Sequence, residues 1–216
     1  MIKNISDQNG FTIIELLISS VVFSVILLIA VTGIIEISRN YIKGYISANT
    51  ENVTRNIVDE IAQGIQSSNP KDVIIPSASP LNGSIYWFCI NGNRYTYQYN
   101  YIVGDINNNL QAFIKDKDPT NPPDNCNTPG LFTNTGAIEL LSKHMELIHP
   151  SNGGILQKVT ASVFEQNLYR INVDILYGDT GTFDPTIKKC NKNSDGGAFC
   201  NNSVYNTTVQ SRTEIN

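Results

Sequence analysis

The sequence predicts an α+β protein in which one long N-terminal helix packs on a mainly antiparallel β-sheet. Three features indicate this architecture. Residues 11–35 are almost entirely apolar, residues 36–68 carry an amphipathic helical pattern, and residues 70–216 are rich in β-forming and turn residues. Because no alternation of strands and helices follows residue 70, the parallel sheet of an α/β protein is not expected.

Length and charge limit the class of protein. A chain of 216 residues is long enough for one good-sized domain, or for a small domain plus an appendage. The formal net charge is −4 and no Lys/Arg run occurs, which argues against a dedicated nucleic-acid surface. The only local basic cluster, Lys188, Lys189 and Lys192, is typical of a solvated loop. No nucleic-acid partner is therefore predicted.

The apolar run from Phe11 to Ile35 is long enough to cross a membrane. As a helix it would reach about 37 Å, which exceeds the roughly 30 Å hydrocarbon core of a bilayer. A cleaved secretory signal has a shorter apolar region and a small-x-small cleavage site, which "VTGIIEISRN" does not provide. The segment is therefore expected to be retained as a membrane span. One carboxylate, Glu15, lies near its start, although a charge at the bilayer centre costs about 2.5–3.5 kcal/mol.

The helix is expected to continue beyond the membrane as its amphipathic half, residues 36–68. Glu51, Arg55 and Asp59 occupy a solvated face at i,i+4 spacing. The pattern fades in "GIQSSNP", which predicts the helix end near residue 67. The opposite stripe is apolar, at steps of four or seven residues: Ile42, Ile46, Val53, Ile57, Ile61 and Ile65.

The residues at the start of the helix carry a resemblance. "GFTIIELL", residues 10–17, resembles the class III signal of type IV pilins and type II secretion pseudopilins. The resemblance implies that residues 1–10 are a leader, that prepilin peptidase cuts between Gly10 and Phe11, and that the new Phe11 amine is methylated. It also implies that Glu15 is the assembly glutamate, which neutralises the terminal amine of a neighbouring subunit. Removing one partner of such a pair would leave an uncompensated charge.

The resemblance also implies location and partners. The chain would be a single-pass protein of the inner (cytoplasmic) membrane with an extracytoplasmic domain, and after assembly it would be part of a pilus at the cell surface. Its partners would be prepilin peptidase, other pilin or pseudopilin subunits through the helix, and the inner-membrane assembly platform. The expected orientation in the membrane rests on the resemblance. The positive charges do not decide it, because the leader has one lysine, Lys3, whereas Arg39 and Lys43 lie beyond the span.

The late part of the chain carries a second, less specific resemblance. "YRINVDILYGD", a two-cysteine loop and "VYNTTVQSR", within about 140–215, resemble the C-terminal half of large minor pilins of the tip-complex kind. Such subunits act in filament initiation, tip structure or adhesion. Type IV pilus, type II secretion and competence systems all remain open. The alternative is a membrane-tethered extracytoplasmic binding module or exoenzyme, in which Glu15 is dispensable and no processing occurs.

The region after residue 70 is expected to form an antiparallel sheet. "GSIYWFCI" and "NRYTYQYNYIV" flank Asn91-Gly92, a strong hairpin signal. The Pro- and Asn-rich segment 116–130 is expected to be a long surface loop. Four tyrosines alternate in the second strand and could stack on bases or sugars, but cross-strand packing is the favoured interpretation: Tyr95, Tyr97, Tyr99 and Tyr101. Further expected strands are "LQAFIK", "KHMELIH", "KVTASVFE", "LYRINVDILYG" and "VYNTTVQSRTEI".

The four cysteines have no C-x-x-C pair, so a structural zinc site is not expected. In a domain beyond the membrane they predict two disulfides with three possible pairings. Cys190 and Cys200 bracket the turn-rich "NKNSDGGAF", which favours that pair and leaves Cys89 with Cys126. Four reduced thiols would require a cytoplasmic domain.

No enzymatic function and no cofactor are predicted. The sequence lacks a G-x-S-x-G elbow, a P-loop, an H-E-x-x-H pair and a G-x-G-x-x-G turn. His144 and His149 lie five residues apart, on opposite faces of a strand, which suits neither a zinc pair nor a triad. Carboxylates are scattered in loops, so no acid/base couple stands out.

A calcium site is a minor alternative in "DINNNLQAFIKD". Its first, third, fifth and twelfth places match an EF-hand count, with Asp105, Asn107, Asn109 and Asp116 as candidate ligands. Leu110 replaces the expected glycine, and flanking helices are missing. The favoured interpretation is a turn followed by a strand.

Overall fold

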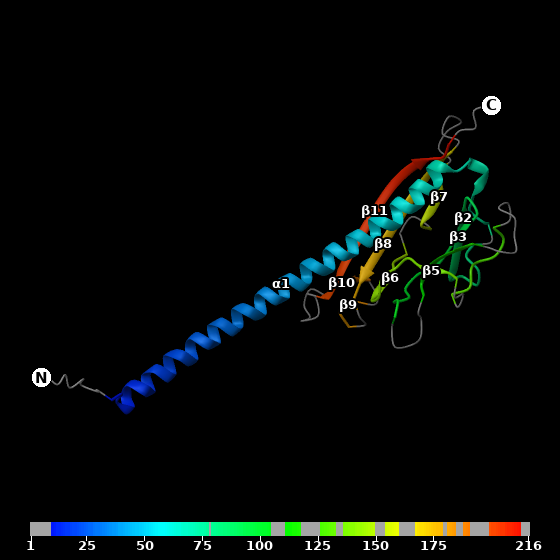
Figure 1. Ribbon diagram of the computed structural model, residues 1–216. Coiled ribbons are helices and arrows are strands. Elements are labelled where there is room, and N and C mark those ends of the chain that lie inside the picture. Colours follow the sequence, from blue (N-terminus) through cyan, green and yellow to red (C-terminus); the bar gives the residue numbers. More distant parts are fainter. Residues whose placement is uncertain are drawn as a thin grey trace, which may run out of the picture. The chain divides into compact units, whose positions relative to one another are not determined.

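The computed structural model describes residues 10–77, 79–104, 111–117, 126–132, 136–149, 154–159, 167–178, 181–184, 188–190 and 199–212. The chain divides into two units, Met1–Ile42 and Lys43–Asn216. Helix α1, Ile13–Ser67, begins in the first unit and ends in the second. Antiparallel strands follow it (Figure 1). The predicted α+β class, with one long N-terminal helix and antiparallel sheets, is confirmed.

Within the second unit, α1 buries one stripe and exposes the other. Glu51, Arg55 and Asp59 are exposed, as the pattern predicted. Thr50 and Thr54 are fully buried although they are polar, because their hydroxyls donate to the carbonyls of Ile46 (2.8 Å) and Thr50 (2.7 Å). The buried stripe in this unit consists of Ile46, Thr50, Thr54, Ile57, Val58, Ile61 and Ile65.

The helix ends where the sequence predicted. The Ser68 hydroxyl donates to the Gly64 carbonyl at 2.5 Å, and the Ser68 N–H donates to Ile65 O at 3.1 Å. These bonds satisfy carbonyls that the last turn leaves without intrahelical partners. A short 3₁₀ helix, Pro70–Asp72, then leads into the first strand.

The first sheet has five antiparallel strands in sequential order: β1 (Val73–Ile74), β2 (Ile85–Ile90), β3 (Asn93–Gln98), β4 (Phe113–Lys117) and β5 (Ile138–Glu139). Asn91 and Gly92 join β2 to β3 with φ of 49° and 74°. Two consecutive positive φ values are what a two-residue hairpin of type I′ requires, so Asn-Gly determines this register.

The second sheet is built on β8 (Leu168–Tyr177). β8 pairs along its whole length with β11 (Asn201–Gln210), and on its other side with β6 (Met145–Leu147) and β7 (Leu156–Lys158). A small ribbon pairs β9 (Phe183–Asp184) with β10 (Lys189–Cys190). Every described strand pair is antiparallel, and one parallel bridge, Tyr99 to Leu147, connects the two sheets. Residues 160–165 of the expected "KVTASVFE" strand lie outside the described residues.

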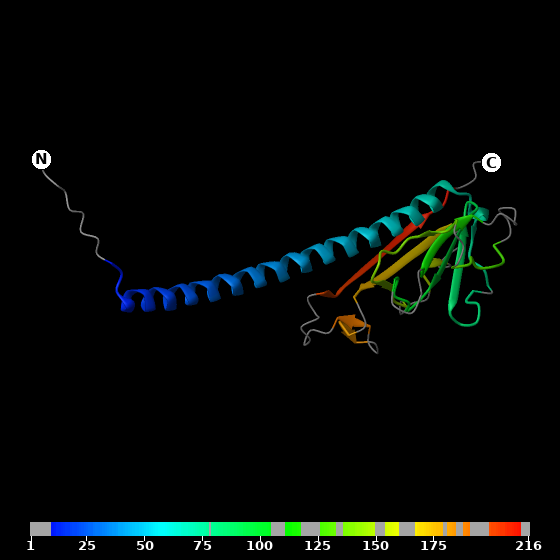
Figure 2. The same ribbon diagram turned by 60° about the horizontal axis from the view of Figure 1, so that its bottom comes forward.

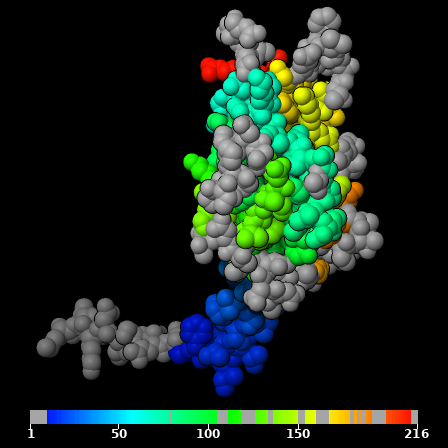
Figure 3. Space-filling model, turned by 90° about the vertical axis from the view of Figure 1, so that its right-hand side faces the viewer, coloured from blue at the N-terminus to red at the C-terminus, as the bar shows by residue number. Residues whose placement is uncertain are grey.

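Both sheets contribute to one core with the second half of α1. Figures 1 and 2 both show β11 and β8 running alongside this part of the helix. A Cβ at position 64 would lie 3.1 Å from Ile90 Cγ2, so Gly64 allows β2 to approach the helix closely. Figure 3 shows the face where the end of α1 (cyan) meets the first sheet (green). The core joins Ile57, Ile61 and Ile65 to Phe88, Tyr95, Phe113, Tyr169, Ile171, Val173 and Ile175.

The tyrosine row belongs to this core. Tyr95, Tyr97 and Tyr99 are all at most 6 % exposed. Tyr95 stacks on Phe88 with ring centroids 5.0 Å apart, and Tyr97 meets Tyr99 edge to face at 5.3 Å. Buried rings cannot stack on bases or sugars, so cross-strand packing, the favoured interpretation, holds for these three.

Two disulfides join loops to the sheets. Cys89 of β2 pairs with Cys126, and Cys190 of β10 pairs with Cys200, which is the pairing favoured from the sequence. Trp87 packs beside the first disulfide, and its indole N–H donates to Cys126 O at 3.1 Å. The disulfide and the indole together fix the end of the expected 116–130 loop against the first sheet.

Candidate assembly site

The start of α1 forms a reciprocal capping arrangement between Thr12 and Glu15. Glu15 Oε2 accepts hydrogen bonds from the Thr12 backbone N–H (3.0 Å) and from the Thr12 hydroxyl (2.9 Å). The Glu15 backbone N–H in turn donates to Thr12 Oγ1 at 3.3 Å. Thr12 directly precedes the first helical residue, so this is a capping box with Glu15 in the first turn. A negative charge there also complements the positive end of the helix dipole.

The expected cleavage position lies just before this cap. Gly10 and Phe11 precede the helix, and Phe11 is 80 % exposed. Among the described residues beyond its two chain neighbours, no atom lies within 4 Å of where a Cβ at Gly10 would sit. The described chain around the predicted scissile bond is thus open to a peptidase. The rest of the predicted leader, residues 1–9, lies outside the described residues.

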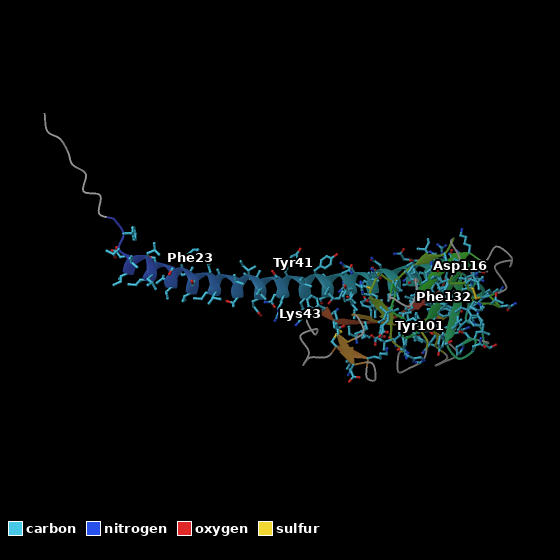
Figure 4. All side chains as sticks on the ribbon, turned by 90° about the horizontal axis from the view of Figure 1, so that it is seen from below. Phe23, Tyr41, Lys43, Tyr101, Asp116 and Phe132 are labelled. Atoms are coloured by element: carbon cyan, nitrogen blue, oxygen red, sulfur yellow. A yellow bond between two sulfur atoms is a disulfide. The ribbon has the colours of Figure 1, made fainter. Side chains whose placement is uncertain are left out.

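The apolar half of α1 exposes its side chains on every side. From Phe11 to Ile37, every large hydrophobic residue is exposed in the isolated chain. Figure 4 shows Phe23 and Tyr41 pointing away from the helix. By length and composition, α1 is the one described helix able to cross a membrane. Apolar surface of this extent requires a bilayer or neighbouring helices as its cover.

Four hydroxyl residues interrupt this surface without leaving polar groups unsatisfied. Ser19, Ser24 and Thr32 donate to carbonyls four residues earlier, at 2.7, 2.8 and 3.0 Å. Ser20 donates to Leu17 O at 2.9 Å. Each donor is satisfied within the helix, so these residues are compatible with hydrocarbon or with a packed helix bundle. Glu15 is the only ionisable side chain between Phe11 and Ile35.

The two histidines lie apart, each beside an aromatic ring at its own end of strand β6. They lie just outside the two ends of strand β6 rather than within it. The His149 ring lies 4.6 Å from the Tyr99 ring and 3.4 Å from the Tyr86 hydroxyl, and the His144 ring lies 6.2 Å from Tyr177. The described part of the chain holds no group of three or more His, Cys, Asp or Glu side chains placed to bind a metal.

The described part of the structure does not bring the four candidate calcium ligands together. Asp105, Asn107 and Asn109 lie outside the described residues. Asp116 is buried in β4, where Arg94 Nε and Nη2 donate to its two oxygens at 2.9 and 2.6 Å. A carboxylate held on both oxygens by a guanidinium has a structural partner without a metal.

Sequence reasoning missed three carboxylates that the fold removes from water: Glu146, which is buried, and Glu139 and Asp174, which are half-buried. Glu139 accepts backbone N–H bonds from Ala112, Phe113 and Leu141 at 2.7–3.3 Å, and burial raises its pKa to about 7. Burial also raises the pKa of Asp174, to about 6, and that of Glu146, which Lys188 contacts at 3.3 Å. Each stands alone in sequence, so no motif could have predicted it. Glu139 links β5 to β4, and Glu146 links β6 to Lys188.

One comparison with known proteins identifies the N-terminal segment. Residues 5–31 match the family model described as the prokaryotic N-terminal methylation motif. Neither a curated protein nor a solved structure matches the chain. The match covers the residues that form the cap at Thr12 and Glu15 and most of the exposed apolar helix. The chain therefore carries a prepilin-type class III signal, and its long N-terminal apolar helix fits that of a pilin or pseudopilin.

Proposed function

We propose that this chain is a minor pilin or pseudopilin subunit of a type IV pilus or a type II secretion-like filament. The observation that carries the proposal is Glu15, the single charge at the first turn of a helix that is otherwise uncharged to residue 35 and exposed on all sides. Prepilin peptidase removes residues 1–10 and methylates Phe11. The chain then waits in the inner membrane, with residues 70–216 forming the extracytoplasmic domain.

Assembly follows from the chemistry of the helix. Packing the apolar halves of α1 from several subunits removes from solvent the surface that the single chain exposes. In that environment the Glu15 carboxylate and the Phe11 amine of a neighbour are each costly alone and offset one another as a pair. The partners are thus other subunits, met through the inner-membrane assembly platform.

Intact mass with N-terminal sequencing of protein recovered from its native membrane tests this proposal. The expected chain starts at N-methylated Phe11 and is four hydrogens lighter than the reduced form, because both disulfides have formed. A chain that still starts at Met1, in cells with an active prepilin peptidase, would overturn the proposal. The helix would then be a tether for a binding module or an exoenzyme.

The role within the filament is proposed as initiation, tip structure or adhesion. The large β-domain and the resemblance of residues 140–215 to minor pilins support a subunit of low copy number. Deleting the gene distinguishes the roles: a loss of filaments indicates initiation, whereas normal filaments that no longer attach indicate adhesion. Copy number in purified filaments equal to that of the main subunit would contradict a minor role.

A further inference from the structure

The outer face of the first sheet is buried although it points away from the main core. Strand register and alternation place one set of side chains on this face, and all of them are at most 8 % exposed: Trp87, Cys89, Arg94, Thr96, Ile114 and Asp116. The alternating positions Phe88, Tyr95 and Phe113 belong to the main core on the other face. An outward sheet face has such low exposure only where another part of the chain covers it.

Residues 126–132, here termed the strap, cover part of this face and begin at a disulfide. Cys126 is joined to Cys89 of β2, and its carbonyl accepts the Trp87 indole N–H at 3.1 Å. These three residues form a small hydrophobic cluster of their own, which is separate from the main core. The contacts at this end of the strap are therefore independent of the core that α1 forms with both sheets.

Polar contacts hold the next part of the strap over β3. Arg94 Nη1 donates to Thr128 O at 3.4 Å, and the Gly130 N–H donates to Thr96 Oγ1 at 2.7 Å. A Cβ at position 130 would lie 3.0 Å from Thr96 Oγ1, so the strap backbone lies directly on the sheet there. Leu131, by contrast, is 71 % exposed, so this aliphatic side chain of the strap adds little to the contact.

The hydrogen bonds of the strap do not suffice to keep it closed. Ordering the backbone of one residue costs at least as much free energy as one hydrogen bond gains on balance. Closure orders all of residues 126–132, and the three hydrogen bonds named above return only part of that cost. The Cys89–Cys126 disulfide supplies what is missing, because it holds one end of the strap beside β2 and so raises the effective concentration of the other contacts.

We infer that the strap is a cover controlled by the redox state of Cys89–Cys126. It is closed while this disulfide is intact, and it opens as a unit when the disulfide is reduced, while the main core stays folded. Opening brings Trp87 into contact with water and gives solvent access to the Arg94–Asp116 ion pair. The inference rests on the contacts of the first sheet and goes beyond the proposed function, which does not involve this face.

The reductant that opens the strap is a dithiol. One of its thiolates attacks a sulfur atom of Cys89–Cys126, and the second thiolate then displaces the cysteine from the mixed disulfide. Two electrons and two protons pass from the dithiol to the protein, so the products are two cysteine thiols and one cyclic disulfide. Reoxidation by a disulfide reagent such as oxidised glutathione reverses the reaction and closes the strap.

Amide hydrogen exchange at single-residue resolution, on the full chain in detergent micelles, tests the opening. The parent chain is compared with the paired variant Cys89→Ser/Cys126→Ser. The Gly130 amide, which bonds to β3, should exchange about 100-fold faster or more in the variant. The Gln98 amide, which bonds to Ala112 O within the first sheet, should change by less than about threefold. Reduction of the parent chain with dithiothreitol should give the same result, so the test does not depend on how the serine variant folds.

A matched variant separates this disulfide from the other one. Cys190→Ser/Cys200→Ser removes the disulfide that joins β10 to the start of β11, and it should leave the Gly130 amide protected. Equal protection of Gly130 with and without the first disulfide would show a strap whose closure ignores the redox state, and would overturn the inference. Faster exchange of Gln98 together with Gly130 would also overturn it, because the whole sheet would then open.

Coupling also runs in the reverse direction, which glutathione buffers test, with thiols and disulfides counted by alkylation and mass spectrometry. Thr96→Val removes the acceptor of the Gly130 N–H, so it should shift the Cys89–Cys126 equilibrium toward thiols by about fivefold. Thr208→Val, at an exposed position of β11, should shift neither disulfide. An unshifted equilibrium for Thr96→Val would show that closure and oxidation are not coupled. None of these readouts depends on processing or filament assembly, so a failure here leaves the proposed function standing.

Discussion

Thr12 and Glu15 hydrogen-bond to each other in both directions at the first turn of α1, and only one oxygen of the carboxylate, Oε2, takes part. Glu15 therefore has a structural role in the isolated chain, because its carboxylate caps the helix to which it belongs. The bonding leaves Oε1 outside the cap. In the proposed filament, that oxygen can accept the amine of a neighbouring subunit without the cap being broken.

This arrangement predicts that charge and capping can be separated by substitution. Glu15→Gln retains an acceptor at the third position of the capping box, where Gln also serves, but removes the charge. We expect the chain to be processed at Gly10 and retained in the membrane, yet lost from filaments. The measurement is the ratio of sheared-filament to membrane protein, with the N-terminus checked by mass.

Two further variants control for that prediction. Ser19→Ala removes a hydroxyl that bonds only within the helix, and it should leave the ratio unchanged. Thr12→Ala removes the cap and should destabilise the helix start by about 1 kcal/mol while the charge remains. Normal filament content for Glu15→Gln would show that the charge has no role in assembly.

The two disulfides should differ in what they contribute to stability. They close loops of different length, with sequence separations of 37 and 10. The chain-entropy relation then gives about 4 kcal/mol for Cys89–Cys126 and about 3 kcal/mol for Cys190–Cys200. Paired Cys→Ser variants, unfolded with urea in micelles, should follow this order. Trp87, the only tryptophan, contacts the first disulfide and reports the transition by fluorescence. A larger loss from the shorter loop would contradict the entropic account.

Parts of this fold were predictable because local signals decided them. Asn91-Gly92 determines a hairpin by its two positive φ values, and the apolar stripe from Ile46 to Ile65 determines the buried face of α1. Thr50 and Thr54 were not predicted to be buried, because only the folded helix shows that their hydroxyls are satisfied by the preceding turn. β1 and β5 have two residues each, too short for any periodicity to reveal.

The assembly site was more predictable than the sheet contacts. Glu15 stands out as a charge in an apolar run, so the role proposed for it rests on the sequence and the resemblance. Glu139 does not stand out, because its importance comes from backbone N–H groups of β4 that lie about 26 residues away in the chain. Contacts of this kind can be recognised only in the folded structure, where burial and hydrogen-bond geometry determine the free energy of an otherwise ordinary carboxylate.

Buried carboxylates give the stability a definite pH dependence. Burial raises the pKa of Glu139 from 4.5 to about 7 and that of Asp174 from 3.8 to about 6. The folded state therefore holds these protons more tightly than the unfolded state does. The stabilisation that these two carboxyl groups provide is complete below about pH 4, and it is lost as the pH rises through 6 and 7. We expect the free energy of unfolding to fall by on the order of 2 kcal/mol across that window.

Urea titrations between pH 4 and 8, read by Trp87 fluorescence, check this prediction. Glu139→Gln cannot ionise, so its profile should be flatter than that of the parent chain. Glu51→Gln, on the exposed face of α1, should leave the profile unchanged. A parent chain whose stability rises from pH 5 to pH 7 would contradict the sign, and would show that the backbone N–H bonds to Glu139 outweigh its burial.

Two ion pairs, one within the first sheet and one between that sheet and α1, allow a direct test of burial. Arg94 and Asp116 form a two-pronged pair with side chains only 9 % and 1 % exposed, and Arg94 Nη1 also reaches Thr128 O. Lys115 and Glu60 meet at the same 2.6 Å, but their side chains are 28 % and 35 % exposed. At equal distance the attraction is stronger in the more buried pair, because burial lowers the effective dielectric, and deleting one partner there also leaves an uncompensated buried charge.

Arg94→Met leaves the Asp116 carboxylate buried without its donor, and it should cost about 3–5 kcal/mol. Lys115→Met leaves Glu60 able to reach water, and it should cost about 1 kcal/mol or less. The double variant Arg94→Met with Asp116→Leu should recover much of the first loss, because neither charge then remains buried. Urea unfolding of the three variants measures these values. Equal losses for the two single variants would contradict the prediction, because they would show that Asp116 is not left as an uncompensated buried charge when Arg94 is removed.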